Sequence, residues 1–220
     1  MKLSGRKIDM KDTITSHKFY AVWEYRREEE DLNEASKNGL QLVKGGCFHS
    51  TFRRDDSVRY IYQLDFCPKI PDKNRYIECF EDAGWEYVNS TFNGWHYFRR
   101  PYTPELSPED VKIYTDKDSL YMMENRWCAI LRACSILTLI SGLFMLCYAA
   151  YSYAAGRPQG YIFILEAAVL LLISVTFHLA IKNVKRIRAG EQAGFVPSAQ
   201  ILFPLAMILV IFCLILTSFY

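Results

Sequence analysis

The residues best suited to catalysis stand close together after a pair of glycines. Cys47 and His49 follow Gly45-Gly46 at a spacing of two, and residues two apart in a strand share one face. A thiol beside an imidazole is the arrangement of a nucleophile and its base. However, no Asn or Asp is placed to orient the histidine, and no helix begins after Cys47 to lower the thiol pKa. We therefore interpret both as ordinary strand residues.

The sequence carries no other catalytic signature. It has no phosphate-binding glycine loop, no nucleophile elbow, no H-E-x-x-H motif and no paired Cys/His ligands. We interpret the acidic run at residues 28–31 as the solvated start of a helix, and the two aspartates at 55–56 as part of a turn. We expect no catalytic residue, no cofactor and no metal site, and therefore a protein that is not an enzyme.

One carboxylate stands inside an apolar run. Glu166 lies six residues into Tyr161–Ile181, where a carboxylate is costly unless it is protonated, paired or near water. Two interpretations stay open: a proton or cation site or a sensor for something outside, or a carboxyl that reaches the outer interface or bonds Tyr148, Tyr151 or Arg157. His178 is twelve residues further on, about 18 Å of helical rise, so it cannot share a site with Glu166.

Charge divides the 220 residues into two unlike parts. Residues 1–128 hold 20 of the 26 Lys+Arg and 22 of the 24 Asp+Glu. The remainder contains three apolar runs, at Ala129–Ala155, Tyr161–Ile181 and Ala199–Phe219. Each is near the roughly 20 residues that a helix needs to cross the hydrocarbon core. This division excludes a single soluble globule and a disordered chain, and the slightly acidic first part argues against nucleic-acid binding.

Basic residues near the membrane ends predict the orientation of the spans. The loop after the second run is rich in them: Lys182, Lys185, Arg186 and Arg188. The turn before that run holds Arg157 alone. The positive-inside rule then places residues 1–128 and the 182–198 loop in the cytoplasm, and the C-terminus outside the cell membrane. Cysteines without metal spacing suit this reducing compartment.

Small residues recur every seven positions in the first apolar run, at Ser135, Gly142 and Ala149. Such a stripe lets helix backbones approach closely, within one chain or between chains. Three spans with one buried carboxylate do not supply the inverted repeats and paired broken helices of a transporter.

Residues 18–100 alternate between strand and helix patterns. The expected elements are a strand at Lys18–Tyr25, a helix at Glu28–Asn38, strands at Leu40–Phe52 and Arg59–Phe66 joined by a hairpin at 53–57, a helix from Pro71 to Ala83, and strands at Trp85–Val88 and Trp95–Arg100 around an Asn93-Gly94 turn. This βαββαβ order is typical of a ferredoxin-like α+β domain. Four large aromatic residues are expected mostly in its core, with some of them on an aromatic surface patch: Trp23, Trp85, Trp95 and Tyr97.

An internal repeat supports the α+β prediction. Asn38-Gly39-Leu40 resembles Ala83-Gly84-Trp85, with the two glycines 45 residues apart. Each copy later reaches Phe-Arg-Arg, at 52–54 and at 98–100. Two similar helix–glycine–strand units are what a pseudo-twofold α+β domain leaves in its sequence.

Four segments follow from these patterns. We expect an N-terminal tail at 1–17, a cytoplasmic α+β domain at 18–100, a linker with a juxtamembrane helix at 101–128, and a three-helix transmembrane region at 129–220. Prolines stiffen the linker, and Ser119 is a suitable cap for the juxtamembrane helix.

Several strings resemble a known bacterial family. FEDAGWEYV, GWHYFRRP and IYTDKDSLYMME occur in that order, after KFYAVWEYRREEEDLNEASKNGLQLVKGGCFHSTFRR. Over about residues 17–125 they look like domain of unknown function 2812. The resemblance implies a membrane-anchored protein of the kind often encoded beside PadR-type transcriptional repressors. It implies no activity and no functional residues.

Together these observations favour a non-enzymatic regulatory or signalling module. Its ferredoxin-like cytoplasmic domain would bind a protein partner, and three transmembrane helices would hold it in the bilayer. The alternative is an accessory subunit of a membrane transport or export system, for which Glu166 and the small-residue stripe are the motivation.

Overall fold

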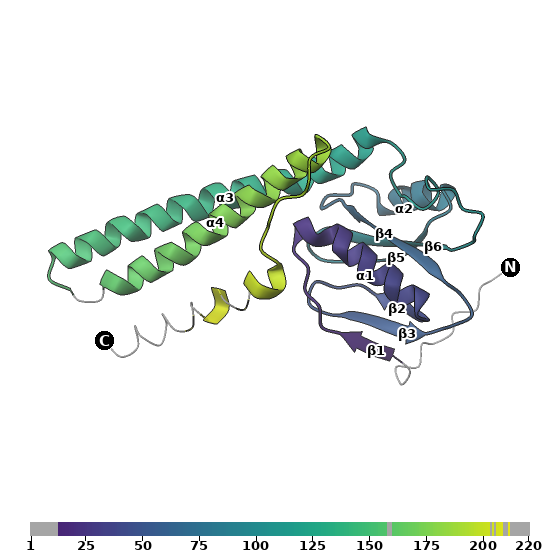
Figure 1. The fold of residues 1–220 in the computed structure, drawn as a ribbon, viewed down its shortest axis with the longest axis horizontal. Helices are drawn as coiled ribbons and strands as arrows, with labels where there is room; N and C mark the ends of the chain where they lie inside the picture. Colours follow the sequence, from purple (N-terminus) through teal and green to yellow (C-terminus); the bar gives the residue numbers. More distant parts are fainter. Residues whose placement is uncertain (1–12, 158–159, 203, 205, 209–210, 212–220) are drawn as a thin grey trace. The chain divides into compact units, whose positions relative to one another are not determined.

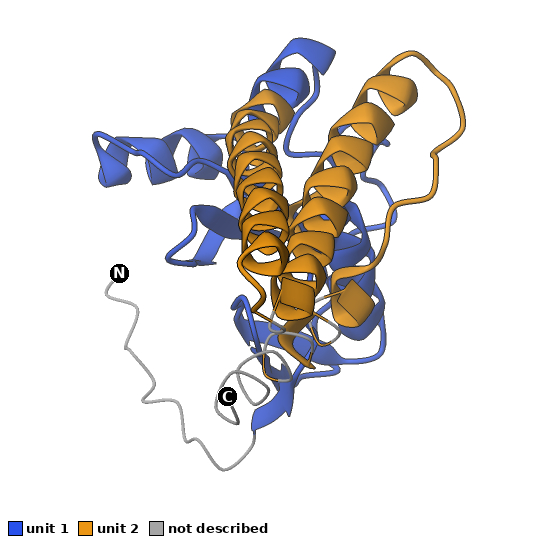
Figure 2. Ribbon diagram, turned by 90° about the vertical axis from the view of Figure 1, so that its left-hand side faces the viewer, with its two compact units in different colours: residues 1–20, 24–123 blue, residues 21–23, 124–220 orange. Residues whose placement is uncertain are grey.

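The computed structural model describes residues 13–157, 160–202, 204, 206–208 and 211. The chain divides into two compact units (Figure 2). Unit 1 comprises residues 1–20 and 24–123, and unit 2 comprises residues 21–23 and 124–220. Each unit is described by itself.

Unit 1 is an α+β domain with two three-stranded antiparallel sheets (Figure 1). The first sheet has the order β1-β3-β2, and the second has the order β4-β6-β5. The strands are β1 (Thr13–Ser16), β2 (Leu40–Lys44), β3 (Ser50–Arg54), β4 (Tyr60–Phe66), β5 (Glu86–Ser90) and β6 (Trp95–Pro101). Helix α1 (Tyr25–Lys37) follows β1, and helix α2 (Lys73–Asp82) follows β4. The domain therefore consists of two successive β-α-β-β halves.

The repeated sequence has the same structure in both halves. Gly39 and Gly84 each follow a helix and have positive φ values of 76° and 83°, which glycine adopts without a Cβ penalty. The strand that follows each glycine then shifts its register with the next strand at the same place in the repeat. The shift comes after Leu42 in β2 and after Tyr87 in β5. The predicted helix–glycine–strand repeat is confirmed, and the structure adds a bulge that the sequence did not predict.

The ferredoxin-like arrangement is not confirmed, because the strands form two sheets. The predicted strand at Leu40–Phe52 is divided at Gly45-Gly46 into β2 and β3, which pair with each other. A Cβ on Gly45 would lie 2.5 Å from the Tyr97 ring, so the backbone needs glycine there. The predicted hairpin at 53–57 is also wrong, since β3 pairs with β1 and β2 while β4 pairs with β6.

The predicted strand at Lys18–Tyr25 is absent. Within this segment the structure has irregular backbone, a 3-10 turn at Val22–Glu24 and the first residue of α1. Lys18 and Tyr20 both donate side-chain hydrogen bonds to Asp31 of α1. The segment that resembles a strand in sequence thus contacts helix α1 through its side chains.

Helix α1 supplies hydrogen-bond partners to the edge of β4. Ser36 accepts from the Tyr60 N–H at 2.7 Å, Asn33 from the Tyr62 N–H at 2.8 Å, and Glu29 from the Leu64 N–H at 2.8 Å. Alternate N–H groups of an edge strand point the same way, and these three side chains meet them from one face of the helix. Helix α1 therefore covers an edge that another strand would otherwise occupy.

The second sheet has its own core, which includes part of the predicted linker. Ile61, Trp85 and Phe98 form this core, and Leu106, Val111 and Ile113 pack against it. The segment after β6 is therefore more closely packed than a tether.

Two helices are long and apolar enough to cross a membrane: α3 (Lys117–Ala154) and α4 (Gly160–Arg188). They run antiparallel and side by side (Figures 1 and 2). Asp116, rather than Ser119, caps α3, because its Oδ1 accepts the Ser119 N–H at 2.7 Å.

The structure thus has two candidate spans, where the apolar runs predict three. The described part of Ala199–Phe219 is a short apolar helix at Ala199–Ile208. The rest of that predicted span lies outside the described residues.

Candidate functional site

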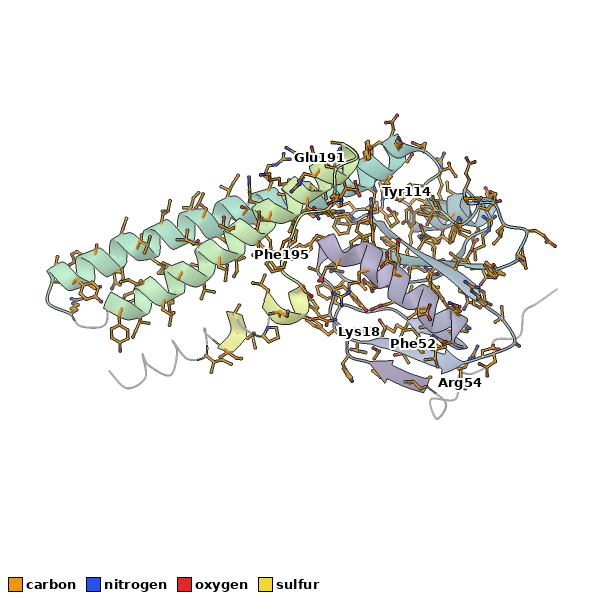
Figure 3. The ribbon with its side chains drawn as sticks, viewed as in Figure 1. Lys18, Phe52, Arg54, Tyr114, Glu191 and Phe195 are labelled. Atoms are coloured by element: carbon orange, nitrogen blue, oxygen red, sulfur yellow. The ribbon has the colours of Figure 1, made fainter. Side chains whose placement is uncertain are left out.

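A pocket of about 150 Å³ lies in the first half of unit 1. Helix α1 contributes Glu28, Asp31, Leu32 and Ala35, whose spacing places them on one helix face. The other lining residues come from β1, the segment after it, β2 and β3: Ile14, Ser16, Lys18, Tyr20, Leu40, Ser50 and Phe52. Figure 3 labels Lys18 and Phe52 beside α1. Apolar side chains dominate the walls, and the charged groups come from α1 and Lys18.

Glu28 is the buried charge of this pocket. It is 8% exposed, and its Oε1 accepts a hydrogen bond from the Tyr97 hydroxyl at 2.6 Å. Burial raises the pKa of Glu28 to about 7, although the Tyr97 hydrogen bond opposes the rise. No lysine or arginine in the described part of the chain forms an ion pair with it. Glu28 is therefore a pocket-lining acid without a cationic partner among the described residues.

Asp31 differs from Glu28 because it has a cation beside it. Lys18 Nζ lies 2.8 Å from its Oδ2, and the Tyr20 hydroxyl donates to the same oxygen. Partial burial alone would raise the pKa of Asp31, but these two hydrogen bonds and the lysine charge hold it below its usual value. Lys18 is therefore engaged with Asp31, and Glu28 is left as the uncompensated acid.

The interpretation of residues 28–31 as a solvated helix start is wrong for two of its members. Glu28 lies in the pocket, and Glu29 bonds β4, where burial raises its pKa to about 8. Their neighbour Glu30 is exposed. The sequence contains a signal for this face of the helix. Its members recur at positions i, i+3, i+4 and i+7, and they are acidic and apolar rather than all polar: Glu28, Asp31, Leu32 and Ala35.

A second buried carboxylate belongs to the opposite half of the domain. Asp65 is 1% exposed and accepts hydrogen bonds from the hydroxyls of Tyr76 in α2 and Tyr114 in the segment before α3 (Figure 3). The His96 ring packs on Tyr76 with centroids 5.1 Å apart, and burial lowers the pKa of His96. This cluster fastens α2 and the segment before α3 to the second sheet.

Two loops at equivalent places in the repeat present phenylalanines to solvent. The β2–β3 loop, 45–49, carries Phe48, which is 58% exposed, and the β5–β6 loop, 91–94, carries Phe92, which is 88% exposed. The loops adjoin at their bases, since Gly45 at the start of the first exchanges hydrogen bonds with Asn89, two residues before the second. We call Phe48 and Phe92 the loop phenylalanines.

Cys47 and His49 lie in the β2–β3 loop, whereas the sequence predicts a strand for them. Burial raises the pKa of the Cys47 thiol, which disfavours the thiolate that a nucleophile requires. The rings expected in the core divide as follows: Trp85, Trp95 and Tyr97 are buried, and Trp23 is half-buried.

In unit 2 the small-residue stripe lies on the face of α3 that meets α4. Ser135 and Ser174 exchange hydrogen bonds, with Ser174 Oγ 2.9 Å from the Ser135 carbonyl. A Cβ on Gly142 would lie 3.1 Å from the Leu171 side chain, and Ala149 is buried. The stripe therefore brings two helices of the same chain together.

The other predicted residues of unit 2 lie apart from one another. Glu166 is half-buried on α4, and within the described part of the chain it has no hydrogen bond or ion pair. Lys182, Lys185 and Arg186 are exposed at the far end of that helix. Arg188 instead forms an ion pair with the buried Glu124, its Nε 2.9 Å from Oε2.

Comparison with known protein families identifies the family of this chain. Residues 24–136 match the model of a family described as a protein of unknown function, DUF2812. The chain belongs to the DUF2812 family. The match begins at the 3-10 turn before α1 and ends within α3, so the DUF2812 region includes the Glu28 face of the pocket but not β1, Lys18 or Tyr20. Neither curated proteins nor solved structures give a match to this chain.

Proposed function

We propose that this DUF2812 protein is a non-enzymatic regulatory module, held in the cell membrane, whose α+β domain binds a cytoplasmic protein partner. The observation that carries the proposal is the exposure of the loop phenylalanines on two adjoining loops. Exposed aromatic rings cost free energy in water, and aromatic residues are enriched where proteins bind one another.

The two loops provide one binding surface with parts from both halves of the repeat. Hydrogen bonds between Asn89 and the Gly45 backbone hold the bases of the two loops together, and the Phe48 ring stacks on Phe19 with centroids 5.7 Å apart. Phe92 projects further into solvent, since 88% of it is exposed. A partner with an apolar pocket would cover Phe92 first and use Phe48 as the neighbouring anchor.

The membrane part of the proposal rests on charge and length. Helices α3 and α4 supply two crossings, and we propose Ala199–Phe219 as a third. The exposed Lys182, Lys185 and Arg186 mark the cytoplasmic end of α4 under the positive-inside rule. On this arrangement unit 1 faces the cytoplasm, where a soluble regulator or enzyme can reach its loops.

Affinity purification of the full-length chain from gently solubilised membranes tests the partner. We expect a specific cytoplasmic protein with the wild-type chain and its loss with Phe92→Ala combined with Phe48→Ala. Phe195→Ala is the matched control, because Phe195 is 84% exposed but lies in unit 2. Recovery of the same protein by the double variant, or of no specific protein by the wild type, would contradict the proposal.

A further inference from the structure

We propose that the pocket beneath α1 is a binding site for a small organic cation, an ammonium group that carries a short hydrocarbon chain. The inference goes beyond the proposed function, because it requires no protein partner and uses none of the loop phenylalanines. Its basis is a buried carboxyl that has no ion pair among the described residues, at the wall of a largely apolar cavity.

Charge selects the sign of the ligand. Glu28 and Asp31 are both acidic, and Lys18 compensates only Asp31, with its Nζ 2.8 Å from Oδ2. A buried carboxylate is stabilised when a cation completes its pairing, whereas an anion would meet two acids. A neutral apolar molecule would fill the cavity but would desolvate Glu28 further. An ammonium group beside Glu28 satisfies both the charge and the hydrogen-bonding capacity of its free oxygen.

Shape limits the size of the ligand. A cavity of about 150 Å³ is the size that holds a benzene-like molecule of roughly six heavy atoms. The side chains of Leu32, Ala35, Leu40 and Phe52 provide the apolar wall for a hydrocarbon chain. Ser16 and Ser50 add hydroxyls from the two neighbouring strands β1 and β3. Butylammonium, with five heavy atoms, fits these dimensions.

Tyr97 orients the carboxyl that the ligand would meet. Its hydroxyl donates to Glu28 Oε1 at 2.6 Å, which leaves the other carboxyl oxygen for the ammonium group. Tyr97 itself is fixed between Glu28 and the close backbone of Gly45, where a Cβ would be 2.5 Å from its ring. The site is therefore preorganised by a contact between the two halves of the domain.

Calorimetric titration of the purified full-length protein with butylammonium tests the site. Butanol and butyrate are the matched neutral and anionic probes. We expect saturable binding of butylammonium, and binding at least about tenfold weaker for either of the other probes. Equal binding of butanol, or no binding of butylammonium, would overturn the inference.

Two variants locate the binding. Glu28→Gln keeps the shape and the acceptor for Tyr97 but removes the charge, so we expect butylammonium affinity to fall about tenfold or more. Ala35→Leu should fill the pocket and abolish binding while Glu28 remains. Glu34→Gln is the control, because Glu34 is exposed on the same helix. Unchanged affinity in Glu28→Gln, with its folding verified by circular dichroism, would also overturn the inference.

The pH dependence provides an independent check. The groups around Glu28 are Asp31, Tyr20, Tyr97, Glu29 and Cys47, with Lys18 at the Asp31 side. Protonation of Glu28 removes the charge that holds the cation. Butylammonium binding should therefore weaken as the pH falls below about 7. Binding that is independent of pH between 5.5 and 8, scanned in about half-unit steps, would place the cation elsewhere.

Discussion

Neighbouring carboxyls of α1 have different environments although they share one acidic run. Glu28 is held by Tyr97 in the pocket, Glu29 by the Leu64 N–H, and Glu30 is exposed. Successive residues of a helix point about 100° apart, so a run of like charges necessarily spreads over several environments. The chemical character of each acid therefore depends on the helix face it occupies and not on the composition of the run.

Replacement of Glu29 by glutamine should change how stability depends on pH. Burial raises the pKa of Glu29 to about 8, so the folded protein retains a proton that the unfolded chain releases above its ordinary value of 4.5. Because the folded state binds more protons between these values, wild-type stability falls as the pH rises from about 4.5 to 8. Glu29→Gln stays neutral and should be more stable at pH 8 by on the order of 2 kcal/mol.

Thermal unfolding of unit 1 in the full chain, followed by tryptophan fluorescence, measures this effect. The two proteins should converge near the ordinary pKa of a glutamate. Glu30→Gln, on the exposed side of α1, should leave the pH profile of the wild type unchanged. Parallel profiles for wild type and Glu29→Gln would show that Glu29 is ionised in the folded protein.

At the level of elements, α1 has two functions on two faces. One face lines the pocket, and the other supplies Glu29, Asn33 and Ser36 to the edge of β4. The second face joins the first β-α-β-β half to the second, because α1 belongs to one half and β4 to the other. Loss of this edge contact should therefore affect both sheets.

Asn33→Ala should destabilise the domain by about 1–3 kcal/mol, the cost of leaving buried backbone groups unpaired. Asn33 accepts the Tyr62 N–H at 2.8 Å and donates to the Tyr62 carbonyl at 3.1 Å. Glu34→Ala is the control, since it places the same favourable helix residue at an exposed position of α1. Amide hydrogen exchange should be faster at Tyr62 in Asn33→Ala alone. Equal protection of Tyr62 in both variants would exclude this role of Asn33.

Local signals predict the two helices of unit 1 and the Asn93-Gly94 turn, whereas the predicted hairpin at 53–57 fails because strand pairing depends on non-local contacts. Asp72 accepts the N–H groups of Asn74 and Arg75, and Gly84 follows the end of α2, as their types indicate. The residues of a strand do not determine which other strand it pairs with. For this reason the sequence predicts a single sheet, whereas the structure has two. The pocket was missed for a similar reason, since its walls come from β1, α1, β2 and β3 together.

At the scale of the whole α+β domain, Asn89 connects the two sheets. Its side-chain amide accepts the Gly45 N–H and donates to the Gly45 carbonyl, both at 2.8 Å. This pair of bonds copies the pattern of two neighbouring strands, at the end of β2 and within β5. Side chains thus join the repeated halves at several places: through Asn89 here, through α1 at the edge of β4, and through the Tyr97–Glu28 hydrogen bond.

The number of membrane crossings determines on which side the chain ends. Two crossings by α3 and α4 would return the chain to the side of unit 1, whereas a third crossing by Ala199–Phe219 would place the C-terminus opposite. We expect three, because this run is as apolar as the others and has no charged residue after Glu191. Unit 1 and the C-terminus should then lie on different sides.

Reporter fusions in a bacterial host distinguish the two topologies. Green fluorescent protein at the N-terminus should fluoresce, and alkaline phosphatase after Tyr220 should be active, because each reporter works on only one side of the membrane. The matched control fuses alkaline phosphatase after Glu191, in the basic loop, where it should be inactive. Inactive phosphatase at both positions would mean two crossings, and Ala199–Phe219 would then be an apolar segment on the cytoplasmic side, where it would itself need a binding partner.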